Sequence, residues 1–209
     1  DGIADNLLPN TRLEFAYHDS KCDATEGLTG ALALTRDAFT EGIAAIIGAG
    51  CSGASLPAAR VAGIEKIPIV SPSSLSPDLS DGRAYPYFLR VAPSDALVAT
   101  AFVDLLTSFL NYTSVAMVSA SDAYSAGIAR AFRDASVQAG VVLSADVRFA
   151  EHAVDLTREV AQLRQSSARV IMLFSQAKDG SNFVSAALGA EVGGEGFLWL
   201  SGFAAISGM

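Results

Sequence analysis

Short apolar runs of strand length alternate along the chain with longer segments whose apolar residues recur at helical spacing. The first run alternates apolar and polar residues, since Leu13, Phe15 and Tyr17 are interleaved with Arg12, Glu14 and Ala16. Predicted strands cover residues 12–17, 43–47, 67–70, 87–91, 115–119, 141–147, 170–174 and 197–200. Helices are predicted near 23–39, 54–63, 95–109, 128–139, 156–163 and 182–191.

Alternating strands and helices specify an α/β fold with parallel sheets covered on both faces. About eight strands are present, and we divide them near residues 91–94 into two Rossmann-like lobes. The predicted lobes are residues 1–93 and 94–209. Ligands of such sheets bind beyond the carboxyl ends of the strands, so the functional residues are expected just after each strand.

Composition excludes several classes of partner. The 209 residues are 51% hydrophobic and 17% charged, with a net charge of -8, which argues against binding to nucleic acid or to an anionic membrane surface. The longest apolar stretch, residues 96–110, contains Thr100, Asp104 and Thr107 and is too short to span a bilayer. We therefore expect any membrane attachment to come from a segment outside this chain. The chain starts at Asp1 without a signal-peptide pattern, as a mature or trimmed chain would.

The glycine-rich stretch from Gly48 to Gly53 follows a predicted strand and opens a predicted helix. It fits the dinucleotide pattern G-x-G-x-x-G, but Ser71 ends the next strand where an acidic residue should bind the ribose. Ser52 also resembles the serine of a nucleophile elbow, and a hydrolase would need His18 or His152 as its base. The interpretation we favour is a helix N-terminus that offers N–H groups and the Ser52 hydroxyl to a carboxylate. A simple helix cap remains the alternative.

Two further features concern the compartment. Cys22 and Cys51 are the only cysteines, and each follows a predicted strand of the first lobe. They are either two buried thiols or one disulfide in an oxidising compartment, and neither has His or Cys neighbours for a metal site. Asn111-Tyr-Thr113 is an N-glycosylation sequon between a predicted helix and a predicted strand. No metal or cofactor is expected.

Four blocks of sequence occur in an order that resembles a known family. They are residues 17–23 (Tyr-His-Asp-Ser-Lys-Cys-Asp), 50–53 (Gly-Cys-Ser-Gly), 71–80 (Ser-Pro-Ser-Ser-Leu-Ser-Pro-Asp-Leu-Ser) and 87–95 (Tyr-Phe-Leu-Arg-Val-Ala-Pro-Ser-Asp). Together they resemble the ligand-binding regions of the type I periplasmic-binding-protein superfamily, above all the Venus-flytrap ectodomains of metabotropic GABA and glutamate receptors. Bacterial branched-chain amino-acid binding proteins and natriuretic-peptide receptors are similar but fit less well. The resemblance also implies that the chain lacks the family's first strand and helix and stops before it returns to lobe one.

The resemblance implies roles for particular residues. Cys22 and Cys51 match a disulfide-bonded pair of the GABA-type relatives. Ser52 matches the serine that holds the ligand carboxylate, and the loop with Ser73 and Ser74 completes that site. The implied residues of lobe two are Tyr124, which covers the ligand, Ser175, where the GABA-type receptors have a tyrosine, and Phe203, where they place an aromatic residue.

Three departures limit what the resemblance implies about the ligand, and one of them is Ser175 in place of a tyrosine. Leu75 stands where amino-acid binders carry a hydroxyl, and Ala92 replaces a polar position of the GABA site. The resemblance therefore implies that the residues that bind the ligand's carboxylate are kept and that those that bind its amine are not.

We therefore expect a non-enzymatic, extracellular or periplasmic receptor region that senses a small carboxylate-bearing molecule by lobe closure and dimerises through lobe one, with itself or with a related chain. The alternatives are a solute-binding protein that serves a transporter, a ligand-silent dimerisation subunit and, last, a hydrolase that uses Ser52.

Overall fold

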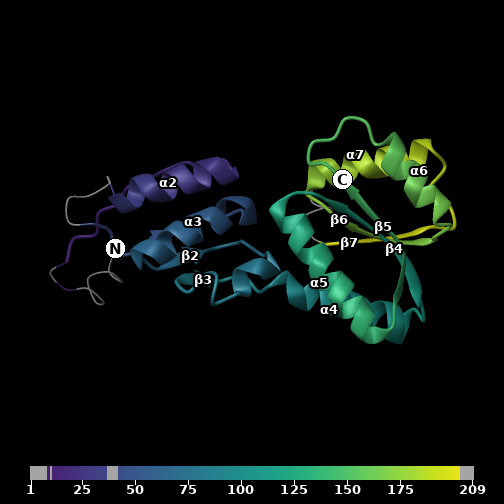
Figure 1. Ribbon diagram of the computed structural model, residues 1–209, viewed down its shortest axis with the longest axis horizontal. Coiled ribbons are helices and arrows are strands. Elements are labelled where there is room, and N and C mark those ends of the chain that lie inside the picture. The colour runs from purple at the N-terminus through teal and green to yellow at the C-terminus, as the bar shows by residue number, and fades with distance from the viewer. Residues whose placement is uncertain (1–8, 10, 37–41, 203–209) are drawn as a thin grey trace.

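The computed structural model describes residues 9, 11–36 and 42–202 and contains two parallel sheets. Figure 1 shows them side by side along the long axis of the molecule, with the N-terminal half in purple and blue and the C-terminal half in teal to yellow. All strand pairs within the described residues are parallel, and helices flank both sheets. The predicted α/β class with helix-flanked parallel sheets is confirmed.

The first sheet has three strands in the order β1-β2-β3. Its elements are α2 (Ala24–Arg36), β1 (Ile46–Ile47), α3 (Ser52–Glu65), β2 (Ile69–Ser71), the 3₁₀ turn η1 (Pro77–Ser80) and β3 (Phe88–Arg90). The two helices pack on one face, where Ile46 and Ile69 are buried with Ala59 and Ala62 of α3. On the opposite face Ile47 and Leu89 are exposed, because no described helix covers it. Coverage of both faces was therefore predicted too broadly for this sheet.

The second sheet has four strands in the order β5-β4-β6-β7. Its elements are α4 (Asp95–Asp104), the π-helical turn η2 (Leu105–Phe109), β4 (Ser114–Ala120), α5 (Ala123–Ala139), β5 (Val142–Phe149), α6 (Thr157–Gln165), β6 (Val170–Phe174), α7 (Ala177–Gly189) and β7 (Leu198–Ser201). Alternate residues of β4 serve different faces: Met117 packs with α4 and α5, and Val118 packs with α6 and α7. This sheet is covered on both faces, which explains why β4 and β6 are continuous apolar runs.

Local capping sets where several helices begin and end. The Asp23 carboxylate accepts hydrogen bonds from the N–H groups of Thr25 and Glu26, so α2 begins there. Ser94 caps α4 as its position in the sequence predicts. Gly140 ends α5 in the left-handed region at φ 73°, a conformation that favours glycine.

Two local predictions are wrong. Residues 11–20 form no strand: Leu13, Phe15 and Tyr17 are 52%, 62% and 87% exposed. Alternation alone does not make a strand, because a strand also needs a neighbour to accept and donate its backbone hydrogen bonds. Phe109 has helical spacing but is 80% exposed, because the π-helical turn adds a residue and rotates it away from the core.

Candidate ligand-binding site

The glycine-rich stretch is a tight turn that carries the chain from β1 into α3. The N–H of Gly48 donates to the carbonyl of Val70 at 2.9 Å, so the turn leaves the sheet beside the end of β2. Gly48 has φ 129°, a conformation that residues with a side chain rarely adopt. The turn and the loop after β2 therefore leave the same edge of the sheet, as parallel strands require.

A disulfide between Cys22 and Cys51 fixes this turn to the segment before α2. Their Cα atoms are 5.2 Å apart, within the usual range for a bridged pair. Cys51 is the residue just before α3, so the bridge acts on the helix start itself. The disulfide implied by the resemblance is present.

Buried hydroxyl groups tie the turn to the loop after β2. The carbonyl of Ala49 accepts hydrogen bonds from the side chains of Ser55, Ser71 and Ser74 at 2.9, 2.6 and 3.3 Å. The hydroxyls of Ser55 and Ser74 also bond to each other at 2.8 Å. These three serines are essentially inaccessible to solvent, so their bonds are made in a low-dielectric interior where they hold the two loops in one arrangement.

The structure brings the three predicted lobe-one residues together. Ser52 is 4% exposed, and its hydroxyl oxygen accepts from the N–H of Ser76 at 3.1 Å. Ser73 is exposed and donates to the carbonyl of Gly50 at 2.9 Å. Ser74 is 1% exposed and bonds to the same carbonyl at 3.2 Å. Much of their hydrogen-bonding capacity is thus used within the protein, and Ser73 is the one of the three open to solvent.

The N-terminus of α3 lacks the side-chain cap found at α2, α4 and α5, and α6 and α7 lack one as well. Its preceding residue, Cys51, makes no capping hydrogen bond, and its first turn contains no acidic residue. The start of α5, by contrast, is capped by the Asp122 carboxylate, which accepts from the N–H groups of Tyr124 and Ser125 at 3.1 Å. The first turn of any helix has N–H groups without intrahelical partners, and an anion is a suitable partner for them.

Charged and polar side chains gather where β3 leads into α4, with Asp95 and Tyr124 buried and Arg90 half-buried. The guanidinium of Arg90, at the end of β3, donates to the carbonyls of Ser74 and Ser76 at 3.3 and 2.8 Å. Asp95, at the start of α4, is 6% exposed, and burial raises its pKa although Tyr124 and Arg90 oppose that effect. Burial and the neighbouring Asp95 carboxylate raise the pKa of Tyr124, so its phenol stays protonated. Asp95 thus lies beside Tyr124 and within the electrostatic influence of Arg90, whose guanidinium contacts the serine loop.

Helix α5 also touches the 3₁₀ turn that follows the serine loop. The Arg130 guanidinium forms an ion pair with Asp78 at 2.5 Å, and a Cβ atom at Gly127 would lie 2.7 Å from the Ser76 hydroxyl. Ser76 therefore contacts Ser52 on one side and α5 on the other. This places the carboxyl edge of the first sheet next to the N-terminal half of α5.

The remaining predicted residues lie at the carboxyl edge of the second sheet or beyond it. Ser175 directly follows β6, is 1% exposed, and its hydroxyl has no hydrogen-bond partner among the described residues. Tyr124 is 6% exposed, and its hydroxyl lies 3.5 Å from where a Cβ atom of Gly202 would be. Phe203 lies outside the described residues.

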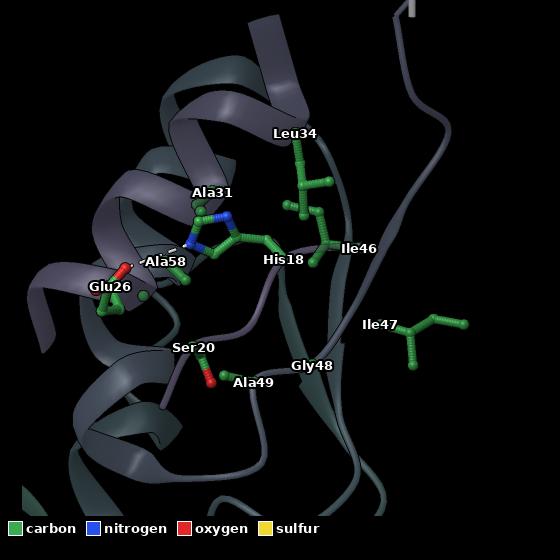
Figure 2. Close-up of a pocket in the computed structure, with 12 residues that line it drawn as sticks. His18, Ser20, Glu26, Ala31, Leu34, Ile46, Ile47, Gly48, Ala49 and Ala58 are labelled. Atoms are coloured by element: carbon green, nitrogen blue, oxygen red, sulfur yellow. Dashed lines mark ion pairs between the residues drawn. The ribbon is translucent and has the colours of Figure 1, made fainter. Parts of the chain in front are cut away.

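Figure 2 shows a separate cavity of about 80 Å³ between α2, α3 and the end of β1. His18 lies at its side with Nε2 3.6 Å from the Glu26 carboxylate, and its ring packs on Gly30, where a Cβ atom would be 2.3 Å away. Gly48 and Ala49 of the turn form another part of the wall. None of the predicted ligand-binding residues lines this cavity.

Neither histidine lies where it could act as the general base that a hydrolase using Ser52 would require. His18 lies beside Glu26, and His152 lies in a loop where Nδ1 is 3.5 Å from the buried Asp179 carboxylate. No hydrogen bond within the described residues joins Ser52 to either histidine. No group of three His, Cys, Asp or Glu side chains in the same part of the chain is arranged to hold a metal ion.

Arg90 and Asp95 were not singled out from the sequence, although both lie in a block on which the resemblance was based. A signal was available, because an arginine at the end of a short apolar strand must find partners for its guanidinium. The contacts of Ser76 and Gly127 had no such signal, since they depend on how the two sheets are placed.

Comparisons with known proteins agree with the fold. Residues 3–208 match the family model described as "Receptor family ligand binding region". Metabotropic glutamate receptor 4 of Macaca fascicularis is 31% identical over 164 residues, which is 77% of this chain and 18% of the receptor. The Mus musculus receptor 4 is 30% identical over the same length, and metabotropic glutamate receptor 8 of Homo sapiens is 28% identical over 162 residues. The matched segment thus spans less than a fifth of each relative. No described helix is both long and apolar enough to cross a membrane.

Proposed function

The chain belongs to the family of receptor ligand-binding regions, and from that membership we propose that it senses a small carboxylate-bearing molecule by closing two lobes around it. It is an extracellular or periplasmic region of a receptor. The proposal concerns the chemistry of the ligand and the motion that reports it. Binding requires no covalent step, so no residue acts as a catalyst.

The proposed lobes are residues 1–93 and 94–209, each with one of the two parallel sheets. The boundary falls between β3 and α4, and the contacts across it include the partly exposed ion pair Arg130–Asp78. A partly exposed ion pair of this kind can be broken and remade at low cost, which suits two bodies that move relative to each other.

The carboxylate is proposed to bind at the N-terminus of α3. The observation that carries the proposal is the missing side-chain cap at Cys51, which leaves the first N–H groups and the positive end of the helix dipole available to an anion. The Ser52 hydroxyl accepts from Ser76, and its own proton has no acceptor among the described residues, so it can donate to the ligand. The adjacent loop is proposed to complete the site through the exposed Ser73, and Ser74 holds that loop in place by its bonds to the carbonyls of Ala49 and Gly50.

The second lobe is proposed to cover the bound molecule with Tyr124, Ser175 and Phe203. The Ser175 hydroxyl is buried and has no partner in the part of the chain that the structure describes, and such a group is stabilised when a ligand supplies one. Contacts from both lobes favour the closed arrangement over the open one, and that difference in affinity is the signal.

A specific observation supports a second candidate, a ligand-silent subunit that acts by dimerisation. The hydroxyls of Ser52 and Ser74 are bonded within the protein, and both residues are more than nine-tenths buried. Leu75 and Ala92 also remove polar groups from the site. In this case the serine network only fixes the loops, and no amino-acid-sized molecule binds. A solute-binding protein for a transporter would bind its ligand in the same way and differs only in what lies downstream.

Isothermal titration calorimetry on the complete ectodomain that contains this chain tests the proposal. The probes are paired compounds that differ only in the carboxylate: serine with ethanolamine, alanine with ethylamine, and GABA with propylamine. Binding of at least one acid but not of its amine partner is expected. Binding of no acid by a folded ectodomain would favour the ligand-silent subunit and reject the proposal.

Variants then locate the carboxylate. Ser73→Asp places a negative charge on the exposed side of the loop, and repulsion of about 1–4 kcal/mol at roughly 4 Å would lower affinity at least fivefold. Ser52→Ala removes a donor and should weaken binding about tenfold. Ser108→Ala, at an exposed position of η2, is the matched control and should bind like the wild type. Unchanged affinity in both site variants would place the carboxylate elsewhere.

We also propose that the chain forms a homo- or heterodimer through lobe one. Exposed apolar side chains lie on both sides of that lobe, Leu28 and Ile64 on its helices and Ile47 and Leu89 on the open face of its sheet, and they support association there. Light scattering after size-exclusion chromatography should show a dimer for the complete ectodomain and a monomer for Ile64→Lys. A dimer that persists in this variant, and in Leu89→Lys, would contradict association through these surfaces.

A further inference from the structure

The turn between η2 and β4 combines an exposed aromatic ring with the glycosylation sequon. Phe109, the last residue of η2, is 80% exposed, and Leu110 and Tyr112 are 37% and 40% exposed. Val142 is 60% exposed and lies beside the turn, because its N–H donates to the carbonyl of Thr113 at 2.8 Å. This apolar patch, formed by Phe109, Leu110, Tyr112 and Val142, has Asn111 at its centre.

The backbone conformation of the turn explains why an asparagine is found at position 111, but it does not explain the residues on either side. Asn111 has φ 54°, and the N–H of Tyr112 donates back to the carbonyl of Leu106 at 2.8 Å, so the chain reverses at a left-handed residue. Asparagine tolerates this conformation better than most residues, which accounts for Asn111 alone. It accounts neither for a threonine two residues later nor for a phenylalanine ring left in water two residues earlier.

We propose that Asn111 carries an N-linked glycan whose first N-acetylglucosamine lies on the Phe109 ring. The Asn111 amide nitrogen attacks the anomeric carbon of a lipid-linked oligosaccharide diphosphate. A C–N bond forms, the bond from that carbon to the diphosphate oxygen breaks, the lipid diphosphate leaves, and the amide loses one proton. The apolar C–H face of the sugar then covers the ring, which removes apolar surface from water.

The two residues are placed for this contact. Asn111 lies at the reversal of the chain, two residues after Phe109, and both residues are exposed, so the first sugar on Asn111 starts close to the ring. The exposed Thr113 supplies the hydroxyl that the transferase requires in the sequon. The inference rests on passage through a glycosylating secretory pathway and not on the ligand, so its failure would leave the proposed binding function intact.

The experiment is a double-mutant cycle on the secreted ectodomain from a glycosylating eukaryotic host. The four proteins are the wild type, Phe109→Ser, Thr113→Ala and the double variant. Thr113→Ala removes the sequon but keeps Asn111 in its left-handed conformation. Peptide mass spectrometry measures occupancy at Asn111, and an endoglycosidase trims each glycan to a single sugar before the thermal midpoints are compared.

We expect Asn111 to be occupied, and the trimmed wild type to melt about 2–4 °C above Thr113→Ala. With Phe109→Ser the same comparison should give less than half of that shift, and this coupling isolates the sugar–ring contact. An unoccupied Asn111 would overturn the proposal. A glycan whose effect is equal with and without Phe109 would reject the ring as its platform.

Discussion

Replacement of Gly27 by alanine tests how closely α2 must approach the start of α3. A Cβ atom at Gly27 would lie 2.4 Å from the carbonyl oxygen of Ala54 and 2.7 Å from its Cα. Non-bonded carbon contacts are favourable at about 3.5 Å, so the helices would have to separate by roughly 1 Å. Both atoms belong to the backbone of a helix, so rotation of a side chain cannot relieve the contact.

Two effects of opposite sign determine the magnitude. Alanine is better than glycine inside a helix by about 1 kcal/mol, and overpacking against a rigid backbone costs about 1–3 kcal/mol or more. We expect Gly27→Ala to lower the free energy of unfolding by about 1–2 kcal/mol, and the thermal midpoint by roughly 2–8 °C. Gly189→Ala, with nothing near its new Cβ atom, is the control and should be neutral or stabilising. A midpoint for Gly27→Ala equal to that of the control, measured by calorimetry, would refute the reasoning.

Three further predictions concern stability. Ser52→Ala should cost about 1–3 kcal/mol in urea unfolding, because the buried N–H of Ser76 loses its acceptor; a loss below about 0.5 kcal/mol would mean that another group replaces it. Replacing both Cys22 and Cys51 by serine should cost about 3–4 kcal/mol by the same measurement, as expected for a bridge across 29 positions, and an unchanged midpoint would contradict this. Burial tends to raise the pKa of Asp146, but hydrogen bonds from two arginines outweigh it and lower the pKa, so its contribution exists above about pH 4 and is lost as pH falls through the folded value. Asp146→Asn should therefore unfold at lower urea concentration than the wild type at pH 7, and its stability should fall less as the pH is lowered. Stability profiles that run parallel for the two proteins across this pH range would exclude the role of Asp146.

Much of the fold follows from periodicity alone, and the failures have physical causes. The strands β4 and β6 are buried on both faces, so their apolar runs leave little ambiguity. Residues 12–17 have a strand pattern yet no strand, because pairing depends on neighbours that the pattern does not specify. Phe109 has helical spacing but a π-helical turn changes its direction, and such a turn has no clear sequence signal.

The candidate site could be predicted only in part. Ser52, Ser73 and Ser74 follow neighbouring parallel strands, and strand ends of a parallel sheet lie at one edge, so their proximity follows from topology. Their hydrogen-bond partners do not, because the sequence does not state whether a hydroxyl faces a carbonyl of its own chain. The cluster of Arg90, Asp95 and Tyr124 joins residues from both halves of the chain, so only three-dimensional placement reveals it.

The three hydroxyls that converge on the Ala49 carbonyl have a consequence for how this site can be altered. The same serines that line the loops also hold them in place, so a substitution that changes recognition there also reduces stability. Selection for a new specificity would reach its limit quickly at Ser55, Ser71 and Ser74, which are essentially inaccessible to solvent. Ser73 is exposed and Leu75 is half-buried, so both can vary at little cost. A directed-evolution library should therefore keep the inner serines and randomise these two positions, and the divergence of related receptors should follow the same division.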